Sequence, residues 1–154
     1  QRTSSIVSSS GLLTNWTVGD SFYSGSGFDE SAGIYIVPES GRYSIKSIIN
    51  FGTTAALTAG IGQNINPGFV IRRTSPTTTD LLSGLIPTLN VNVALVLNLR
   101  AILGGGTVIL TGDVYLNQGD EIGIFYEADG LSVNINVGGP TAAGTTWSMH
   151  KLSD

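Results

Sequence analysis

The sequence predicts an all-β protein, an antiparallel two-sheet jelly-roll sandwich of about ten strands. Three observations lead to this prediction. Helical periodicity is almost absent, because no window carries a 3.6-residue apolar pattern without glycine or β-branched interruptions. Short runs with period-two alternation recur along the chain, and turn residues separate them. The 154 residues, of which 41% are hydrophobic, can bury the core of a single domain spanning residues 1–154.

The low charge content excludes several functional classes. Charged residues make up 12% of the chain, against a usual share of roughly 25%, so serine, threonine, asparagine and glycine must cover much of the surface. The net charge of −4 and the single adjacent basic pair, Arg72-Arg73, leave no basic footprint for nucleic acid. Cysteine is absent, which excludes disulfides and thiol chemistry. The most apolar region, residues 81–103, contains Pro87 and Arg100 and fails as a membrane span.

The first half of the chain contains one dominant strand. Residues 1–11 are serine-rich and predicted to be loose or strand-like at the edge, residues 13–18 form a first strand, and residues 33–37 form a short strand that Pro38 ends. The turn at Pro38 leads, as in a hairpin, into the strongest strand, residues 41–51. Alternation divides this strand into a core face, Tyr43, Ile45, Ile49 and Phe51, and an opposite face, Ser44, Lys46, Ile48 and Asn50.

The second half alternates between strands and glycine-marked turns. Residues 53–67 are predicted to be a long loop that can include a short strand, and residues 69–73 a strand. Residues 91–99 alternate most strictly and are predicted to form one strand, which a flexible hairpin loop at residues 104–106 follows. The turn at residues 117–120 makes residues 107–116 and 121–127 hairpin partners. The last two predicted strands are residues 131–137 and 145–152.

Four motifs in order resemble the C1q-like globular head domain of the C1q/TNF superfamily. Residues 33–45, GIYIVPESGRYSI, follow the signature G-x-F-x-x-P-x-x-G-x-Y-x-F, with Ile45 in place of the final aromatic residue. Residues 15–17 and 27–29 resemble the first strand and the loop after it, and residues 114–122 resemble the L-x-x-G-D-x-V hairpin. Residues 147–152 lie where the family carries F-S-G-F-L-L, with Met149 and His150 replacing its usual Gly and Phe. A bacterial or phage-type member is the better match, because the cysteines of animal members are missing.

The resemblance implies a TNF/C1q-like jelly roll and a tight homotrimer, with one sheet of each subunit facing the threefold axis. It also implies an extracellular location, at a cell, spore or virion surface, and a stalk, often collagen-like, outside this chain. The chain itself has no Gly-X-Y run. We expect eight residues at the trimer interface: Lys46, Ile48, Val108, Leu110, Trp147, Met149, His150 and Leu152.

No catalytic residues are predicted. His150 is the only histidine, no G-x-S-x-G elbow supplies a nucleophile, and a packed or interface histidine explains it better. Asp113, Asp120 and Asp129 are candidate calcium ligands, since some heads of the family bind calcium, although turn chemistry alone also favours aspartate there. No other cofactor is expected.

Two aromatic residues, Trp16 and Tyr23, are candidates for stacking on a ligand, with core packing as the alternative. The sequence therefore predicts a non-enzymatic trimerising head domain of a surface or fibre protein, which presents loops to a protein or glycan partner. A monomeric carbohydrate-binding jelly-roll module is the alternative. Oligomeric state separates the two, since a trimer has a mass near three times 16.0 kDa.

Overall fold

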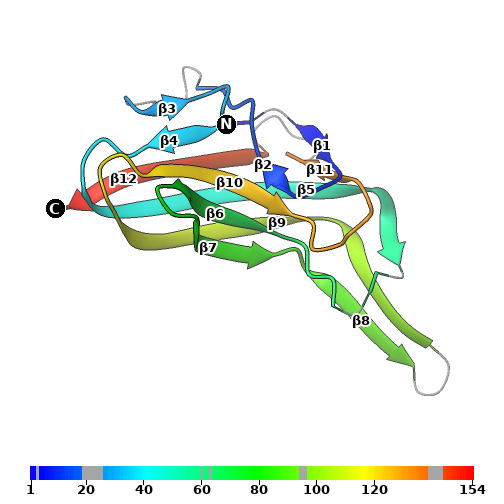
Figure 1. The fold of residues 1–154 in the computed structure, drawn as a ribbon. Coiled ribbons are helices and arrows are strands. Elements are labelled where there is room, and N and C mark those ends of the chain that lie inside the picture. Colours follow the sequence, from blue (N-terminus) through cyan, green and yellow to red (C-terminus); the bar gives the residue numbers. More distant parts are fainter. Residues whose placement is uncertain (3, 19–25, 60, 63, 94–96, 139–143) are drawn as a thin grey trace.

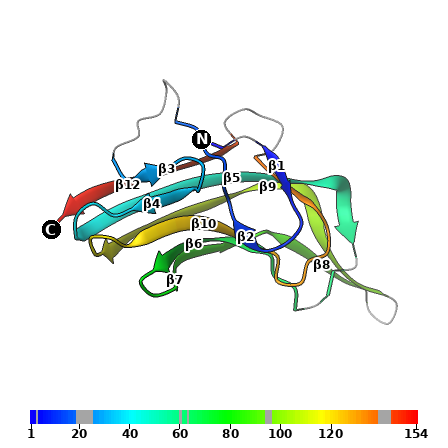
Figure 2. The same cartoon turned by 45° about the horizontal axis from the view of Figure 1, so that its top comes forward.

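The chain folds into two antiparallel sheets that pack face to face (Figures 1 and 2). The computed structural model describes residues 1–154 except 3, 19–25, 60, 63, 94–96 and 139–143. At residues 54–59, 91–93, 97–99 and 103 it describes the backbone alone. The described residues form twelve strands. Within them, no helix has the length and hydropathy needed to span a membrane.

The first sheet contains the two longest strands. Its strand order is β1-β11-β5-β9-β8, and β12 also pairs with β5. The bounds of these strands are β1 (Ser5–Val7), β5 (Gly41–Ala59), β8 (Thr88–Val93), β9 (Leu97–Leu116), β11 (Ile135–Val137) and β12 (Thr145–Ser153). Both β12 and β11 pair with the same edge of β5. β12 pairs with residues 42–49, and β11 pairs with residues 51–53.

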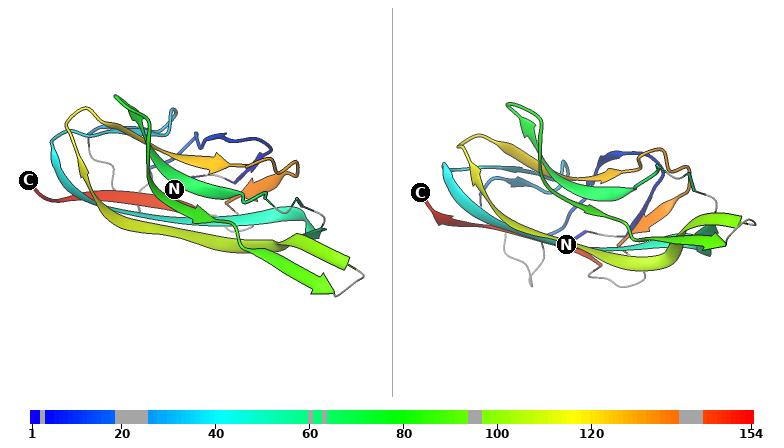
Figure 3. Two further views of the ribbon diagram at one scale, coloured as in Figure 1. Left: turned by 60° about the horizontal axis from the view of Figure 1, so that its bottom comes forward. Right: turned by 90° about the horizontal axis from the view of Figure 1, so that it is seen from below.

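The second sheet is built around β10. Its strand order is β3-β4-β10-β6-β7, and β2 also pairs with β10. The bounds are β2 (Gly11–Leu12), β3 (Phe28–Asp29), β4 (Ile34–Ile36), β6 (Gly68–Ser75), β7 (Thr79–Leu85) and β10 (Glu121–Glu127). Figure 3 shows β10, β6 and β7 as one layer and β12, β5 and β9 as the other.

The core lies between the two sheets. Tyr43, Ile45, Ile49 and Phe51 of β5 are all at most 4% exposed, which confirms the predicted core face of this strand. They face the inward residues of β10, which are Ile122, Ile124 and Tyr126. Each fully buried isoleucine contributes about 1.5–3 kcal/mol through the hydrophobic effect, so β5 and β10 hold the sandwich together.

Two predicted hairpins are wrong. The turn at Pro38 joins β4 of the second sheet to β5 of the first, and the turn at residues 117–120 joins β9 of the first sheet to β10 of the second. The two turns bond to each other, because Val37 N–H donates to Asp120 O (2.9 Å) and Gly119 N–H donates to Val37 O (2.8 Å). Both connections therefore close the same end of the sandwich.

The region from residue 88 to residue 102 also differs from prediction. Residues 91–99 form two strands, β8 and the start of β9, with Val91 opposite Leu99 and Val93 opposite Leu97. Odd-numbered residues pair with odd-numbered residues, so the sequence alternation continues from one strand into the next. We call β8 with residues 97–102 of β9 the arm, because it extends beyond the rest of the sandwich (Figure 1).

Several predicted boundaries shift as well. Residues 104–106 lie inside β9 rather than in a loop, and a Cβ on Gly106 would lie 2.9 Å from Phe51 Cζ. Within residues 53–67, β5 continues to Ala59. Residues 13–18 form no strand, although Trp16 makes an isolated bridge to Arg2, and residues 131–137 contribute only β11.

Candidate functional site: the outer face of the first sheet

Three neighbouring strands, β12, β5 and β9, build a broad face on the side of the first sheet away from the core. The register places Ile48 of β5 between Thr146 of β12 and Ile109 of β9. Two residues along, Lys46 lies between Ser148 and Thr111. Because side chains alternate across a sheet, these residues share one face, which we call the outer face.

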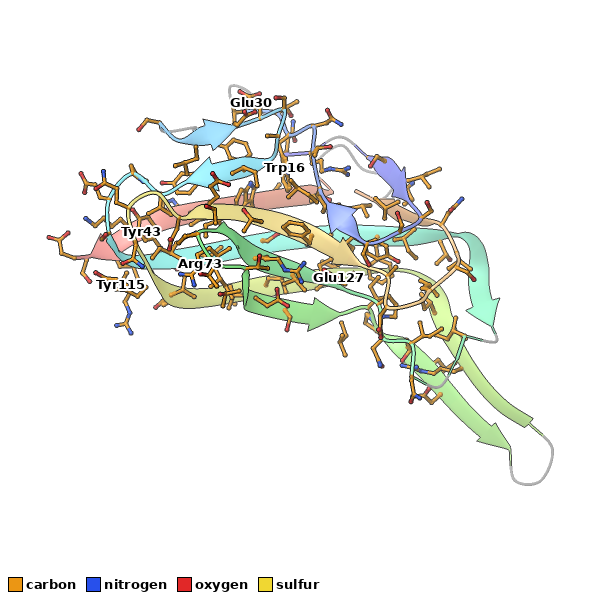
Figure 4. All side chains as sticks on the ribbon, in the orientation of Figure 1. Trp16, Glu30, Tyr43, Arg73, Tyr115 and Glu127 are labelled. Carbon is orange, nitrogen blue, oxygen red and sulfur yellow. The ribbon has the colours of Figure 1, made fainter. Side chains whose placement is uncertain are left out.

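The outer face carries large apolar side chains that the described chain leaves in solvent. Four of its residues are strongly exposed, namely Ile48 (46%), Ile109 (65%), Tyr115 (62%) and Leu152 (53%). They are four of the eight large hydrophobic residues that are exposed in the described part of the chain. Figure 4 shows Tyr115 at the end of the molecule where Tyr43 also lies. Isolated exposed apolar residues are common, but a concentration on three adjacent strands is typical of interaction surfaces, which makes the outer face the candidate site.

Charged residues lie among these apolar ones. They are Arg42, Lys46 and Asp113, and the histidine His150 lies beside them. Among the residues that the structure describes, none of these four residues enters an ion pair. The second sheet differs, since Arg72 contacts Glu127 at 2.9 Å and Arg73 contacts Asp120 at 3.4 Å. The outer face therefore combines exposed apolar groups with charges of both signs that have no ionic partner within the described chain.

One row of the outer face contains a histidine, a serine and an aspartate. His150 lies opposite Ser44, and Ser44 lies opposite Asp113. A catalytic triad needs the histidine between the serine and the acid, whereas here the serine lies between the other two. The histidine and aspartate strands are separated by about 10 Å, twice the usual strand spacing, so no carboxylate orients the imidazole. This row does not form a nucleophilic site.

The structure divides the predicted interface residues into two groups. Lys46, Ile48, His150 and Leu152 lie exposed, on the outer face or at its end. The prediction fails for Val108 and Leu110, which are 5% and 2% exposed and belong to the subunit's own core. Two further predicted residues, Trp147 and Met149, are half-buried on the core side of β12, and their place at an interface stays a prediction. Trp147 packs at 5.6–5.8 Å from the rings of Phe28 and Trp16, and Met149 packs against the core.

Sequence reasoning missed Ile109 and Tyr115. The run Val108-Ile109-Leu110 is apolar throughout, so it does not reveal which residues face outward. The signal lay in the neighbouring residues, because Thr107, Thr111 and Asp113 are polar and odd-numbered. Period-two alternation from these positions assigns Ile109 and Tyr115 to the outer face.

Of the two candidate ligand aromatics, the structure describes only Trp16, and it is buried. Trp16 is 3% exposed, and its Nε1–H donates a 2.6 Å hydrogen bond to Leu13 O. Its ring packs against Trp147, so it is not available to stack on a ligand. Tyr23 lies outside the described residues.

The three candidate calcium ligands lie apart, and two of them, Asp120 and Asp129, already accept hydrogen bonds from the backbone. Asp113 lies on the outer face, whereas Asp120 and Asp129 lie beyond opposite ends of β10. Asp120 Oδ2 accepts a hydrogen bond from Asn117 N–H (3.0 Å), and Asp129 Oδ2 accepts one from Asn66 N–H (2.7 Å). In the part of the chain that the structure describes, no three His, Cys, Asp or Glu residues gather as a metal site would require. Their local hydrogen bonds explain Asp120 and Asp129 as structural residues.

Comparison with solved structures identifies the fold. Murine APRIL matches with a TM-score of 0.57 and 16% identity, over 96% of this chain and 92% of that chain. Eiger TNF from S. frugiperda matches with a TM-score of 0.53 and 11% identity, over 99% and 93% of the two chains. No family model and no curated protein matches the chain. At these identities the likeness establishes the fold alone, a TNF-like jelly roll, which confirms the predicted fold class.

Proposed function

We propose that this chain is a non-enzymatic head domain that associates as a homotrimer through the outer face of the first sheet. The observation that carries the proposal is the composition of that face. Ile48 and Ile109 lie side by side and exposed, and the charges around them have no ionic partner within the described chain. A second copy would bury the apolar groups and bring opposite charges together.

The charges of the outer face suit association between identical copies. Asp113 is acidic, whereas Arg42 and Lys46 on the neighbouring strand are basic. A rotation axis that brings copies of this face together can supply each acid with a basic partner from another subunit. The choice of three copies rests on the resemblance of the sequence to C1q-like heads.

The role we propose for the assembly is to present its loops to a protein or glycan partner at a cell, spore or virion surface. The low charge content and the lack of cysteine suit a polar, serine- and threonine-covered surface protein. The alternative, a monomeric carbohydrate-binding module, loses support because Trp16 is buried in the core.

Mass in solution tests the proposal. We expect a species near three times 16.0 kDa in sedimentation or light-scattering measurements at micromolar concentration. A stable monomer under these conditions would contradict the proposal.

Matched substitutions locate the interface. Ile48→Asp places a charge on the outer face, where Ile48 is 46% exposed, and we expect it to weaken the trimer at least about tenfold. Ile36→Asp is the control, because Ile36 is 48% exposed but belongs to β4 of the second sheet. If both substitutions weaken the trimer equally, the outer face is not its interface. The mass measurement still decides whether a trimer forms.

A further inference from the structure

We infer that the outer face carries a pH switch at His150, whose protonation weakens the association between subunits as the pH falls. This inference rests on the proposed function, because it concerns the surface through which the proposed trimer forms. His150 is the only histidine of the chain. Histidine is the one side chain whose ordinary charge change falls between about pH 5 and 8. Acidification across this range therefore changes the charge of the outer face through His150.

The register fixes the surroundings of His150. It lies exposed on β12, directly opposite Ser44 of β5, and Figure 1 shows the two strands side by side. Arg42 and Lys46 lie two residues to either side of Ser44, on the same face of β5. Such diagonal neighbours are about 7–8 Å apart in an antiparallel pair, which is within reach of long side chains. Two cationic side chains therefore flank the imidazole diagonally.

The acidic groups around His150 are farther away or engaged elsewhere. Asp113 of β9 lies on the far side of Ser44, about 10 Å from the histidine strand. Lys151, the next residue of β12, contacts the carboxylates of Asp154 and Glu39. Among the described residues, no carboxylate lies within ion-pair distance of His150. Within its own subunit, a protonated His150 thus gains no acidic partner.

The charge balance of the outer face decides the effect of the proton on association. With His150 neutral, the described face carries one acid, Asp113, and two bases, Arg42 and Lys46, which gives a net charge of +1. The acid that one subunit offers is therefore already outnumbered by the bases of its neighbour. Protonation raises the net charge to +2 without adding an acid. Repulsion between like charges and burial in the interface both disfavour the charged imidazole.

These two effects give the pH dependence its direction. In the free subunit His150 is exposed, so it binds a proton more readily there than in the trimer. A fall in pH favours the state that binds more protons, which is the free subunit. The trimer is therefore most stable at neutral and alkaline pH and dissociates progressively as the pH falls through the range of histidine.

Sedimentation of the wild-type protein tests the inference directly. The midpoint, which is the chain concentration at which half of the chains are monomeric, is measured at about pH 8 and about pH 5.5, on either side of most of the histidine range. Salt concentration is held constant, and circular dichroism checks that the subunit is folded at both pH values. We expect the midpoint to rise at least about tenfold on acidification. An unchanged or lower midpoint at the acidic pH would overturn the inference and leave the proposed trimer intact, whereas a monomer at both pH values would overturn both.

Two variants separate His150 from other groups that titrate. His150→Gln keeps a polar side chain that cannot ionise. We expect its midpoints at the two pH values to differ less than about twofold, whatever its affinity at the higher pH. Adding Ile36→His to this variant returns a histidine to the chain on β4 of the second sheet, where Ile36 is 48% exposed. The difference should stay as small, and a wild-type response in either variant would overturn the inference.

Lys46→Gln tests whether charge causes the response. With His150 neutral, this substitution lowers the net charge of the described outer face from +1 to zero. Because repulsion between identical faces grows with the square of their charge, we expect the logarithm of the ratio of the two midpoints to fall by up to about two thirds. A hydrogen bond that neutral His150 made to a neighbouring subunit would not respond to this change. An undiminished ratio in Lys46→Gln would therefore overturn the inference.

Discussion

At the scale of single residues, two buried tyrosines allow a direct test of hydrogen bonding in the core. Tyr126 is fully buried and its hydroxyl has no partner among the described residues, whereas the Tyr43 hydroxyl donates to Glu39 O at 2.8 Å. We expect Tyr126→Phe to leave the free energy of unfolding unchanged or to raise it by up to about 1 kcal/mol, and Tyr43→Phe to lower it by about 0.5–1.5 kcal/mol. Urea denaturation measures both, and equal losses would show that Tyr126 bonds a buried water.

The same tyrosine makes stability depend on alkaline pH. Burial raises the pKa of Tyr126 from 10.0 to about 12. The folded state therefore holds the phenolic proton more tightly than the unfolded state. The contribution of the protonated Tyr126 side chain to the free energy of unfolding is fully present below pH 10 and is lost as the pH rises from 10 towards 12. We expect Tyr126→Phe to reduce the loss of stability across this range in denaturation curves, and parallel curves for the two proteins would contradict this.

At the scale of strands, close packing explains why glycine occupies the middle of β9. A Cβ on Gly106 would lie 2.9 Å from Phe51 Cζ and 3.0 Å from Phe51 Cε1, so Gly106→Ala must displace a buried ring. We expect this substitution to destabilise the fold by about 1–3 kcal/mol. Gly11→Ala in β2 is the control, since a Cβ there meets no atom within 4 Å. Thermal unfolding of the two variants provides the measurement.

The positions of the strands could be predicted from the sequence far better than which strands pair with each other. Alternation identified the core face of β5, because successive side chains of a half-buried strand point alternately to the core and to solvent. The turns at Pro38 and Gly119 could not be assigned correctly, since glycine and proline mark a hairpin and a crossing between sheets equally well. The strict alternation of residues 91–99 concealed a hairpin, because opposite residues with odd numbers keep the pattern unbroken across the two strands.

The candidate site was predictable only where polar residues marked the outward side. Lys46 on β5 identified Ile48 as its exposed neighbour. On β9 the run Val108-Ile109-Leu110 is apolar throughout and does not show which residue faces outward. The two buried residues, rather than the exposed Ile109, were therefore assigned to the interface. For Trp16, aromatic composition fits a ligand platform as well as a core, and only its burial beside Trp147 decides between them.

At the scale of the whole molecule, the outer face is the surface on which the proposed trimer depends. Half of the strongly exposed large hydrophobic residues in the described chain lie on this one side of one sheet. A chain with only 12% charged residues has few means to keep such a surface soluble alone. In the proposed trimer, association with copies of the same chain covers this surface.

Charge reversal tests whether identical subunits meet through the outer face. In the proposed trimer Asp113 of the outer face is buried, and a buried acid without a partner costs several kcal/mol, so the proposal pairs it with a base of a neighbouring subunit such as Lys46. We expect Asp113→Lys and Lys46→Asp each to weaken the trimer and the double variant to recover part of the loss, with a coupling free energy of about 0.5–3 kcal/mol. Sedimentation at constant salt concentration measures all four proteins. If the free-energy effects of the two single substitutions simply add, Asp113 and Lys46 do not interact across the interface, because the effects of independent sites add. The trimer itself would remain compatible with that result.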